Sequence, residues 1–171
     1  MRKTILKIAI SLSLIFSMNL LSAQDIKFSG QVFSKNNSLD DVKIEVFDNN
    51  EKVVEDVTRK NGKFKLKLAE GKIYLVKVSK DKFVSKTIII TALVGKEKAK
   101  EGFEFDIEME KERDFRYVSK FNVDDPVAHV FYNHSKQEFD WDKELTQEKH
   151  DEIAALKELN KDKRNDKYSK F

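Results

Sequence analysis

The 171-residue chain contains no cysteine and a single proline, Pro126, and each scarcity limits what the protein can be. Without cysteine the protein forms no disulfide bond, even if it is exported, and carries no lipid-modified N-terminal cysteine. Cysteine is also absent as a nucleophile, and no serine stands in a Gly-x-Ser-x-Gly motif. The scarcity of proline leaves long stretches of the chain free to form strands.

Residues 8–23 form an uncharged stretch of 16 residues, which is short of the roughly 20 that a membrane-spanning helix needs. It follows three basic residues, Arg2, Lys3 and Lys7, and ends with the small residue Ala23. A positive start, a short apolar segment and a small residue are typical of a secretory signal peptide. We predict a signal peptide over 1–23 that is cleaved after Ala23, the alternative being an uncleaved segment that anchors the protein to the membrane.

The predicted mature chain has no excess of charge. The signal contains three of the 33 basic residues and none of the 30 acidic ones, so the remaining 148 residues carry 30 of each. Nucleic-acid binding depends on an excess of Lys and Arg, and the sequence therefore gives no basis for it. A chain of this length forms one ordinary domain with a tail and buries a hydrophobic core without disulfide bonds.

From residue 25 to residue 110, apolar and polar side chains alternate in short segments separated by polar turns. This alternation is the pattern of a strand with one buried and one solvated face, because successive side chains point to opposite faces. The segments that follow it are 26–32, 42–47, 52–58, 63–68, 73–78, 83–92 and 103–109. Seven strands at this spacing, without a helical period between them, predict a mainly β domain over 24–110, a seven-strand antiparallel β-sandwich.

Residues 58–83 form the centre of this region and contain two strands and two turns. Asn61-Gly62 and the segment 69–72 each contain a glycine, which tolerates the left-handed conformations of tight turns. We therefore expect strands 63–68 and 73–78 to pair as a hairpin within a β-meander. The second strand is apolar on both sides at its start, which indicates a central position or a covered outer face.

Four motifs follow one another between residues 26 and 92. They are Phe28-Ser29-Gly30-Gln31-Val32, Leu39-Asp40-Asp41-Val42-Lys43-Ile44-Glu45-Val46, Thr58-Arg59-Lys60-Asn61-Gly62-Lys63-Phe64 and the segment 71–83. In this order they resemble the carboxypeptidase regulatory-like domain, a transthyretin-like β-sandwich that is common in envelope proteins of Bacteroidetes. The Asn61-Gly62-Lys63-Phe64 turn is the most specific part. The resemblance implies a non-catalytic interaction module on an exported or outer-membrane protein.

The chain departs from the pattern of that family at two turns. Asp81-Lys82-Phe83 stands where Gly-Tyr is usual, and Asp41 stands where glycine is common before the second strand. These are turn substitutions, so the resemblance still implies the fold but leaves the subfamily open.

Residues 111–141 are predicted to be an extended segment with several large aromatic side chains. Those singled out are Phe131, Tyr132, Phe139 and Trp141. A free linker is poor in such residues, so we expect this segment to pack on the sandwich or to bind a partner. In the first alternative the rings complete the sandwich core, each burying about 150–250 Å². In the second they form an interface, where Trp and Tyr are enriched, and we carry all four as the candidate interface.

Residues 142–171 are predicted to form a helix to about Lys167, followed by a charged end. Asp142 or Thr146 can cap the start of this helix, because their side-chain oxygens can accept from its free N–H groups. A thin apolar stripe gives the helix one face to bury. Its members are Leu145, Ile153, Leu156 and Leu159.

No group of residues has the spacing of a metal site or of a catalytic site. The chain contains three histidines, which are His129, His134 and His150. They lack the spacing of zinc ligands, and the acidic loops lack the alternate carboxylates of a calcium loop. Asp140 and Asp142 flank Trp141 as acids flank an aromatic ring in sugar-binding clefts, but acids at a helix start are more often caps. We expect no catalytic residue, no metal and no cofactor.

These observations predict a non-catalytic, exported binding or scaffolding protein of a bacterial cell envelope, located in the periplasm or at the outer-membrane surface. Its expected partner is an envelope protein or a surface polymer, and not a nucleic acid. Two alternatives stay open. A carbohydrate- or peptide-binding module would have a concave pocket lined by Trp141 and Tyr132. An unrecognised hydrolase would bring His129, His134 and acidic residues into one cleft.

Overall fold

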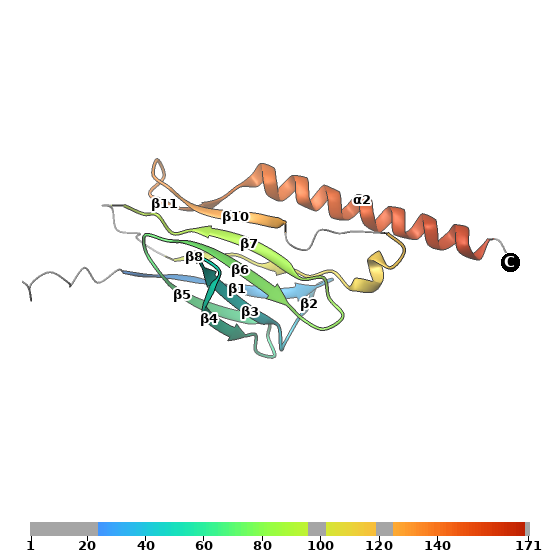
Figure 1. The fold of residues 1–171 in the computed structure, drawn as a ribbon, viewed down its shortest axis with the longest axis horizontal. Helices are drawn as coiled ribbons and strands as arrows, with labels where there is room; N and C mark the ends of the chain where they lie inside the picture. Colours follow the sequence, from blue (N-terminus) through green and yellow to red (C-terminus); the bar gives the residue numbers. More distant parts are fainter. Residues whose placement is uncertain (1–23, 96–101, 119–124, 170–171) are drawn as a thin grey trace, which may run out of the picture.

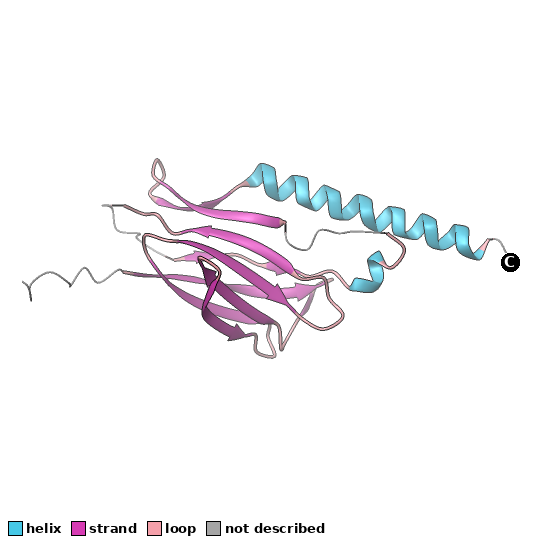
Figure 2. Cartoon of the chain, viewed as in Figure 1, coloured by secondary structure: helices cyan, strands magenta, loops and turns pink. Residues whose placement is uncertain are grey.

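In the computed structural model, residues 24–95, 102–118 and 125–169 are described, and they form a β-sandwich with a long C-terminal helix beside it (Figure 1 and Figure 2). The predicted signal peptide 1–23 lies outside these residues. The strands are β1 (Asp25–Ser34), β2 (Asn37–Ser38), β3 (Lys43–Asp48), β4 (Glu51–Val57), β5 (Lys63–Ala69), β6 (Ile73–Ser79), β7 (Lys86–Thr91), β8 (Phe103–Glu104), β9 (Ile107–Glu108), β10 (Pro126–Asn133) and β11 (Glu138–Trp141). The helical elements are the 3₁₀ helix η1 (Glu112–Phe115) and the helix α2 (Lys143–Tyr168).

Two sheets face each other and enclose one main core. Among the described residues, β1 pairs with β2, β5, β8 and β9 in the first sheet, and the second sheet has the order β11-β10-β7-β6-β3-β4. Buried and exposed side chains alternate along the strands, as in β5, where Phe64, Leu66 and Leu68 are buried between exposed lysines. The predicted mainly β sandwich is therefore confirmed as a two-layer fold.

The sheets are mixed, so the prediction of a seven-strand antiparallel sandwich is wrong in strand number and in direction. β8 and β9 run parallel to β1, and β10 runs parallel to β7. A parallel neighbour needs a long connection, and the chain between β7 and β10 supplies one. Side-chain alternation indicates which face of a strand is buried, but not which strand lies beside it or in which direction that strand runs.

The expected hairpin at residues 69–72 is also wrong, because the two strands that it joins lie in different sheets. β5 pairs with β1, whereas β6 pairs with β3 and β7. Gly71 has a φ of 88°, a conformation that favours glycine, in the turn that leads from one sheet to the other. β6 has the central position that its apolar start indicated, but its outer face is open, since Ile73 is 56% exposed.

The predicted strand 103–109 is divided into β8 and β9, and Gly30 of β1 explains how this segment fits. The carbonyl oxygen of Phe105 lies so close to Gly30 that a Cβ built there would be 1.7 Å from it. At the break between the two short strands, the Gln31 N–H donates to Asp106 Oδ1 (2.9 Å). Any side chain at position 30 would therefore push the β8–β9 segment away from β1.

Both turns that depart from the family pattern adopt the left-handed conformation that glycine favours. Asp41 has a φ of 49° and Lys82 has a φ of 66°. The Asn61-Gly62 turn forms as predicted, with Gly62 at a φ of 70° and its N–H donating to Arg59 O (2.7 Å). The two departures thus change the residue at each turn without removing the left-handed backbone conformation.

Helix α2 confirms the predicted C-terminal helix and starts one residue after its cap. The Leu145 N–H donates to Asp142 Oδ1 (2.9 Å), so Asp142 satisfies one of the free N–H groups of the first turn. Glu144 places a negative charge near the positive end of the helix dipole. Across the described residues, neither helix combines the length and the apolar character that crossing a bilayer requires.

The helix is held against the sandwich by a second, smaller core and by one polar contact. The buried members of this core are Val84, Phe115 and Ile153. The side-chain oxygen of the buried Asn160 accepts a hydrogen bond from the Tyr117 N–H (2.7 Å). Beyond Asn160, residues 161–167 are all exposed, and Figure 1 shows the helix extending past the sheets.

Candidate binding groove

The four candidate interface residues do not gather on one surface. Tyr132 and Phe139 are buried in the main core (5% and 6% exposed), where the Phe139 ring meets the Phe28 ring edge-on with centroids 5.1 Å apart. Phe131, which precedes Tyr132, is half-buried and faces the outer side of β10, and Trp141 is 44% exposed at the end of β11. Tyr132 and Phe139 thus complete the core, which leaves Phe131 and Trp141 open to solvent.

Trp141 lines a groove of about 350 Å³ that separates the two sheets along one edge of the sandwich. One wall is the β8–β9 segment, the other is β10, and the first turns of α2 form a third side. Buried apolar side chains form its floor, and they are Ile88, Ile107, Val130 and Ile153. A ligand-binding module was expected to have a concave pocket lined by Trp141 and Tyr132. This groove is lined by Trp141 but not by Tyr132.

Aromatic rings form the part of the groove nearest β8. The Phe103 ring centroid lies 5.8 Å from that of Phe105 and 6.2 Å from that of Trp141. Lys143 Nζ lies 5.4 Å from the centroid of the Trp141 ring, in cation–π contact. Because Phe103 and Phe105 are half-buried, this wall offers an apolar surface that solvent partly reaches.

Three exposed carboxylates line the β8–β9 side of the groove, and they belong to Glu104, Asp106 and Glu108. None of the three forms an ion pair with another residue of the described ranges. The helix side of the groove differs, because Lys149 Nζ lies 2.9 Å from Glu152 Oε2, and this hydrogen bond raises the pKa of Lys149 above its ordinary value. Unpaired negative charge therefore gathers on the β8–β9 side.

A group of three charged side chains, two of them buried, connects β7, the segment after β9 and α2. Lys86 Nζ lies 3.0 Å from Glu110 Oε2, and Lys157 Nζ lies 3.6 Å from Glu110 Oε1. The side chains of Lys86 and Glu110 line the groove and are only 10% and 7% exposed. Burying a charge is costly unless the charge is paired, so this group holds the three elements at a defined spacing.

The backbone of the β8–β9 segment has one side without a strand partner in the described parts of the chain. On the β1 side, the Phe105 N–H donates to Ser29 O (3.0 Å) and the Met109 N–H donates to Phe33 O (2.8 Å). Alternate residues of a strand direct their N–H and C=O groups to opposite sides. Residues 104 and 108 therefore direct theirs away from β1, toward the open edge of the sandwich.

The structure does not bring the histidines and the acids together in one cleft. His129 Nε2 lies 2.9 Å from Thr91 Oγ1, and the His134 ring packs edge-on against the Tyr132 ring with centroids 5.1 Å apart. Only His150, of the three histidines, lines the groove. Within the described ranges, no group of three or more His, Asp or Glu side chains is placed to hold a metal ion.

Sequence reasoning missed the β8–β9 wall as a site. The alternation of Phe103, Phe105 and Ile107 with acids was visible, and it correctly indicated one apolar face. It did not indicate that this face lines a groove at an open edge. The signal that points there is the row of carboxylates at positions 104, 106, 108 and 110, which is the densest alternation of one charge in the chain.

No protein-family model and no curated protein matches the chain. Among solved structures, it is distantly similar to a DUF3823 family protein from Parabacteroides merdae (TM-score 0.40, 15% identity, 53% of this chain and 48% of that one). It is similar at the same level to 3-chlorocatechol 1,2-dioxygenase from Rhodococcus opacus (TM-score 0.41, 13% identity, 53% and 61%). A type II cohesin–X-dockerin complex from Acetivibrio cellulolyticus gives a TM-score of 0.35 at 17% identity over 50% and 58% of the two chains. The chain thus spans about half to three fifths of these structures, and the similarity identifies no family.

Proposed function

We propose that the protein is an exported, non-catalytic binding module of a bacterial cell envelope, and that it holds an extended, positively charged peptide segment of a partner protein in the groove. One observation carries the proposal. Within the described ranges, a strand edge without a partner, an apolar floor and three carboxylates without ion pairs lie together along the β8–β9 segment. Binding takes place by surface complementarity, and no side chain has a chemical role.

An extended peptide suits the open backbone edge of β8 and β9. A peptide that adds to a sheet edge gains main-chain hydrogen bonds, and its alternate side chains enter the neighbouring pockets. In the groove, the inward-facing side chains of such a peptide meet Ile107 and the rings of Phe103 and Phe105. Apolar residues at alternate positions of the peptide therefore fit this floor and wall.

Positive charge suits the outer side of the same segment. Residues two apart in a strand are about 7 Å apart, and this spacing holds for the groove wall and for a peptide strand lying along it. Lys or Arg at alternate positions of the peptide can therefore meet Glu104, Asp106 and Glu108 in turn. Complementary charge of this kind also raises the rate of encounter and disfavours acidic partners.

Two features of the sequence support the location and the absence of catalysis. Segment 1–23 has the pattern of a secretory signal peptide, which supports a partner in the periplasm or at the outer-membrane surface. The motif order in residues 26–92 resembles the carboxypeptidase regulatory-like domain, and that resemblance implies a non-catalytic interaction module.

Trp141 is the single tryptophan of the chain, so its fluorescence reports directly on the groove. Residues 24–171 would be titrated with three short peptides in which Val alternates with Lys, with Glu or with Ser. The Lys peptide is expected to shift the Trp141 emission and to bind about tenfold or more tightly than the other two at low salt. Equal binding of the three peptides, or no binding, would contradict the proposal. Binding of cello- or chito-oligosaccharides in place of the peptides would replace it with a carbohydrate-binding function.

A matched pair of variants tests whether the carboxylates of the groove are responsible. Glu104→Gln combined with Glu108→Gln removes two charges from the groove, and Glu148→Gln combined with Asp162→Asn removes two charges from exposed positions of α2 outside it. The first pair is expected to abolish the preference for the Lys peptide, and the second is expected to leave it unchanged. If both pairs weaken binding equally, the effect comes from net charge and not from the groove.

Point substitutions are the appropriate test because the C-terminal region belongs to the sandwich. A chain ending at Val118 would lose β10 and β11 from the second sheet, and the buried Tyr132 and Phe139 with them. Loss of binding by such a chain would follow from unfolding alone.

A further inference from the structure

The outer face of the second sheet carries an apolar stripe that runs across four adjacent strands. Phe47 of β3 lies opposite Leu75 of β6, and Leu75 lies opposite Ile89 of β7, so the three side chains leave the same face. Ile73 of β6 lies opposite Thr91 of β7, which in turn lies opposite Phe131 of β10. We call Phe47, Ile73, Leu75, Ile89 and Phe131 the outer stripe.

Two members of the outer stripe are exposed among the described residues, and the other three are half-buried. Ile73 is 56% exposed and Leu75 is 40% exposed, although both lie on a central strand. The helix does not cover them, because α2 packs against β10 and η1, and Figure 1 shows it along the β10 edge of the sheet. A monomer rarely exposes contiguous apolar side chains on the flat face of a sheet without an interaction partner.

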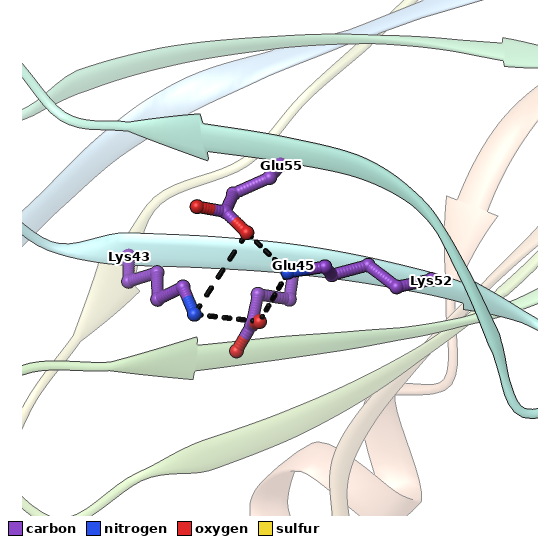
Figure 3. Close-up of polar contacts among 4 residues, drawn as sticks. All are labelled: Lys43, Glu45, Lys52 and Glu55. Carbon is purple, nitrogen blue, oxygen red and sulfur yellow. Dashed lines mark hydrogen bonds and ion pairs between the residues drawn. The ribbon is translucent and has the colours of Figure 1, made fainter.

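The other end of the same face carries a group of paired charges. Lys43 Nζ lies 2.7 Å from Glu45 Oε1, Lys52 Nζ lies 3.2 Å from the same atom, and Lys52 is also paired with Glu55 (Figure 3). The hydrogen bond from Lys43 is the main reason that the pKa of Glu45 lies below its ordinary value. The two lysines and two glutamates of this group cancel in charge, and Lys77, which lies opposite Glu45 on the same face, adds one positive charge.

We propose that a second copy of this chain packs on this face, with the outer stripes of the two copies in contact around a two-fold axis. A two-fold axis through the stripe places each apolar side chain against the stripe of the partner copy. The same axis moves the two charged groups to opposite rims, where they stay hydrated, as in interfaces with an apolar centre and a polar rim. Because the four paired charges of each group cancel, only Lys77 is left on each face to repel the partner copy.

The interface is small, so the association is weak and reversible. Strand spacing and rise give the face dimensions of about 20 by 25 Å. It therefore buries at most about 500 Å² per copy, below the roughly 800 Å² per partner of a standard interface. The site is also separate from the groove, because Phe131 faces outward while its neighbour Val130 lines the groove. A dimer of this kind leaves both grooves accessible.

Sedimentation equilibrium of residues 24–171 over a concentration series reaching about 1 mM tests the proposal. The wild-type chain is expected to be a monomer–dimer mixture, and Leu75→Lys is expected to raise the dissociation constant at least about tenfold. Leu159→Lys is the matched control, since Leu159 is 44% exposed on α2, away from this face, and it is expected to change nothing. A wild-type chain that stays monomeric overturns the proposal, as does an equal effect of the two substitutions.

The absence of cysteine allows a second test that locates the contact. Leu75→Cys places a thiol in the outer stripe and Leu159→Cys places one on the helix. Mild oxidation is expected to cross-link the first variant into a dimer much faster than the second, and equal rates would overturn the face assignment. The Glu104→Gln and Glu108→Gln pair is expected to dimerise normally, so failure of the dimer and failure of the peptide-binding function are distinguishable.

Discussion

Along the edge where β4 meets β5, the two sheets of the sandwich are joined directly, whereas along the edge where β8 and β9 face β10 a groove separates them. At the closed edge, the Lys65 N–H donates to Asp56 Oδ2 (3.3 Å), and the hydroxyl of the buried Thr58 donates to Leu39 O (2.8 Å). At the open edge, the Lys86–Glu110 pair and the ring of Phe103 span the space between the sheets.

The two edges also differ in how far apart in sequence their parts lie. The closed edge is built within residues 39–69, so short loops bring its parts together. The open edge combines 102–110, 126–130 and 141–157, which meet only after long loops close. The candidate site therefore lies where segments late in the chain complete the two sheets but leave a groove between them. A few contacts set the width of this groove.

The largest effect is expected from Glu110→Leu at the open edge. This change leaves Lys86 buried without its carboxylate and should destabilise the fold by about 3–5 kcal/mol. Urea unfolding, followed by Trp141 fluorescence and circular dichroism, measures it. The double variant with Lys86→Leu should recover much of the loss, because no charge is then left buried. If the double variant is as unstable as the single one, the pair is not what holds the open edge.

The next largest effect is expected from Gly30→Ala, which tests the wall of the groove. The added Cβ would lie 1.7 Å from Phe105 O, so the β8–β9 segment must move, at a cost of about 3 kcal/mol. Gly71→Ala is the control, because a Cβ at that position meets nothing within 4 Å and only the strain of a positive φ remains, about 1 kcal/mol. Equal losses for the two variants would mean that the close approach at Gly30 is unimportant.

A smaller effect is expected from Asp56→Ala at the closed edge. The Lys65 N–H loses its acceptor near solvent, which should cost about 1 kcal/mol. The emission of Trp141 in the folded state should not change, since the groove lies at the other edge of the sandwich. A shift in that emission would show that the two edges are coupled, and the contrast between them would fail.

The smallest effect concerns pH and Asp140 on β11, beside the open edge. The side-chain hydrogen bond from Lys136, and then the bond from the Trp141 N–H, lower the pKa of Asp140 below its ordinary value. A carboxyl with a lowered folded pKa stabilises the fold above its unfolded pKa, and this contribution is lost as pH falls through the folded pKa. Asp140→Asn should therefore lower the Tm slightly at pH 7, and the difference should vanish well below about pH 4. A difference that does not depend on pH would contradict this assignment.

The sequence predicted the buried face of most strands and the start of the helix, because both depend on local patterns. Phe64, Leu66 and Leu68 are buried as their alternation indicated, and Asp142 caps α2. The alternation could not reveal that β5 and β6 belong to different sheets, since a turn of three residues serves a hairpin and a sheet-to-sheet crossing equally well. Pairing partners depend on long-range packing that no local pattern contains.

The candidate site was less predictable than the fold. Phe139 and Trp141 lie two residues apart on one face of β11, and the sequence treats them alike. Phe139 is 6% exposed and Trp141 is 44% exposed, because Trp141 is the last residue of β11 and lies over the groove. The difference in exposure follows from the length of β11. Asp142, which begins the helix, sets this length, and the aromatic residues do not.

The last turns of α2 hold the end of the helix at a fixed distance from its last buried contact. Residues 161–168 continue the helix beyond its final buried contact at Asn160, and at 1.5 Å per residue they reach about 12 Å past it. Figure 1 shows this end opposite the end of the molecule where β1 starts. Anything attached after residue 169 is therefore held by a stiff spacer, clear of the groove and of the outer stripe. A reporter fused there would tumble with the whole molecule and leave both proposed surfaces unobstructed.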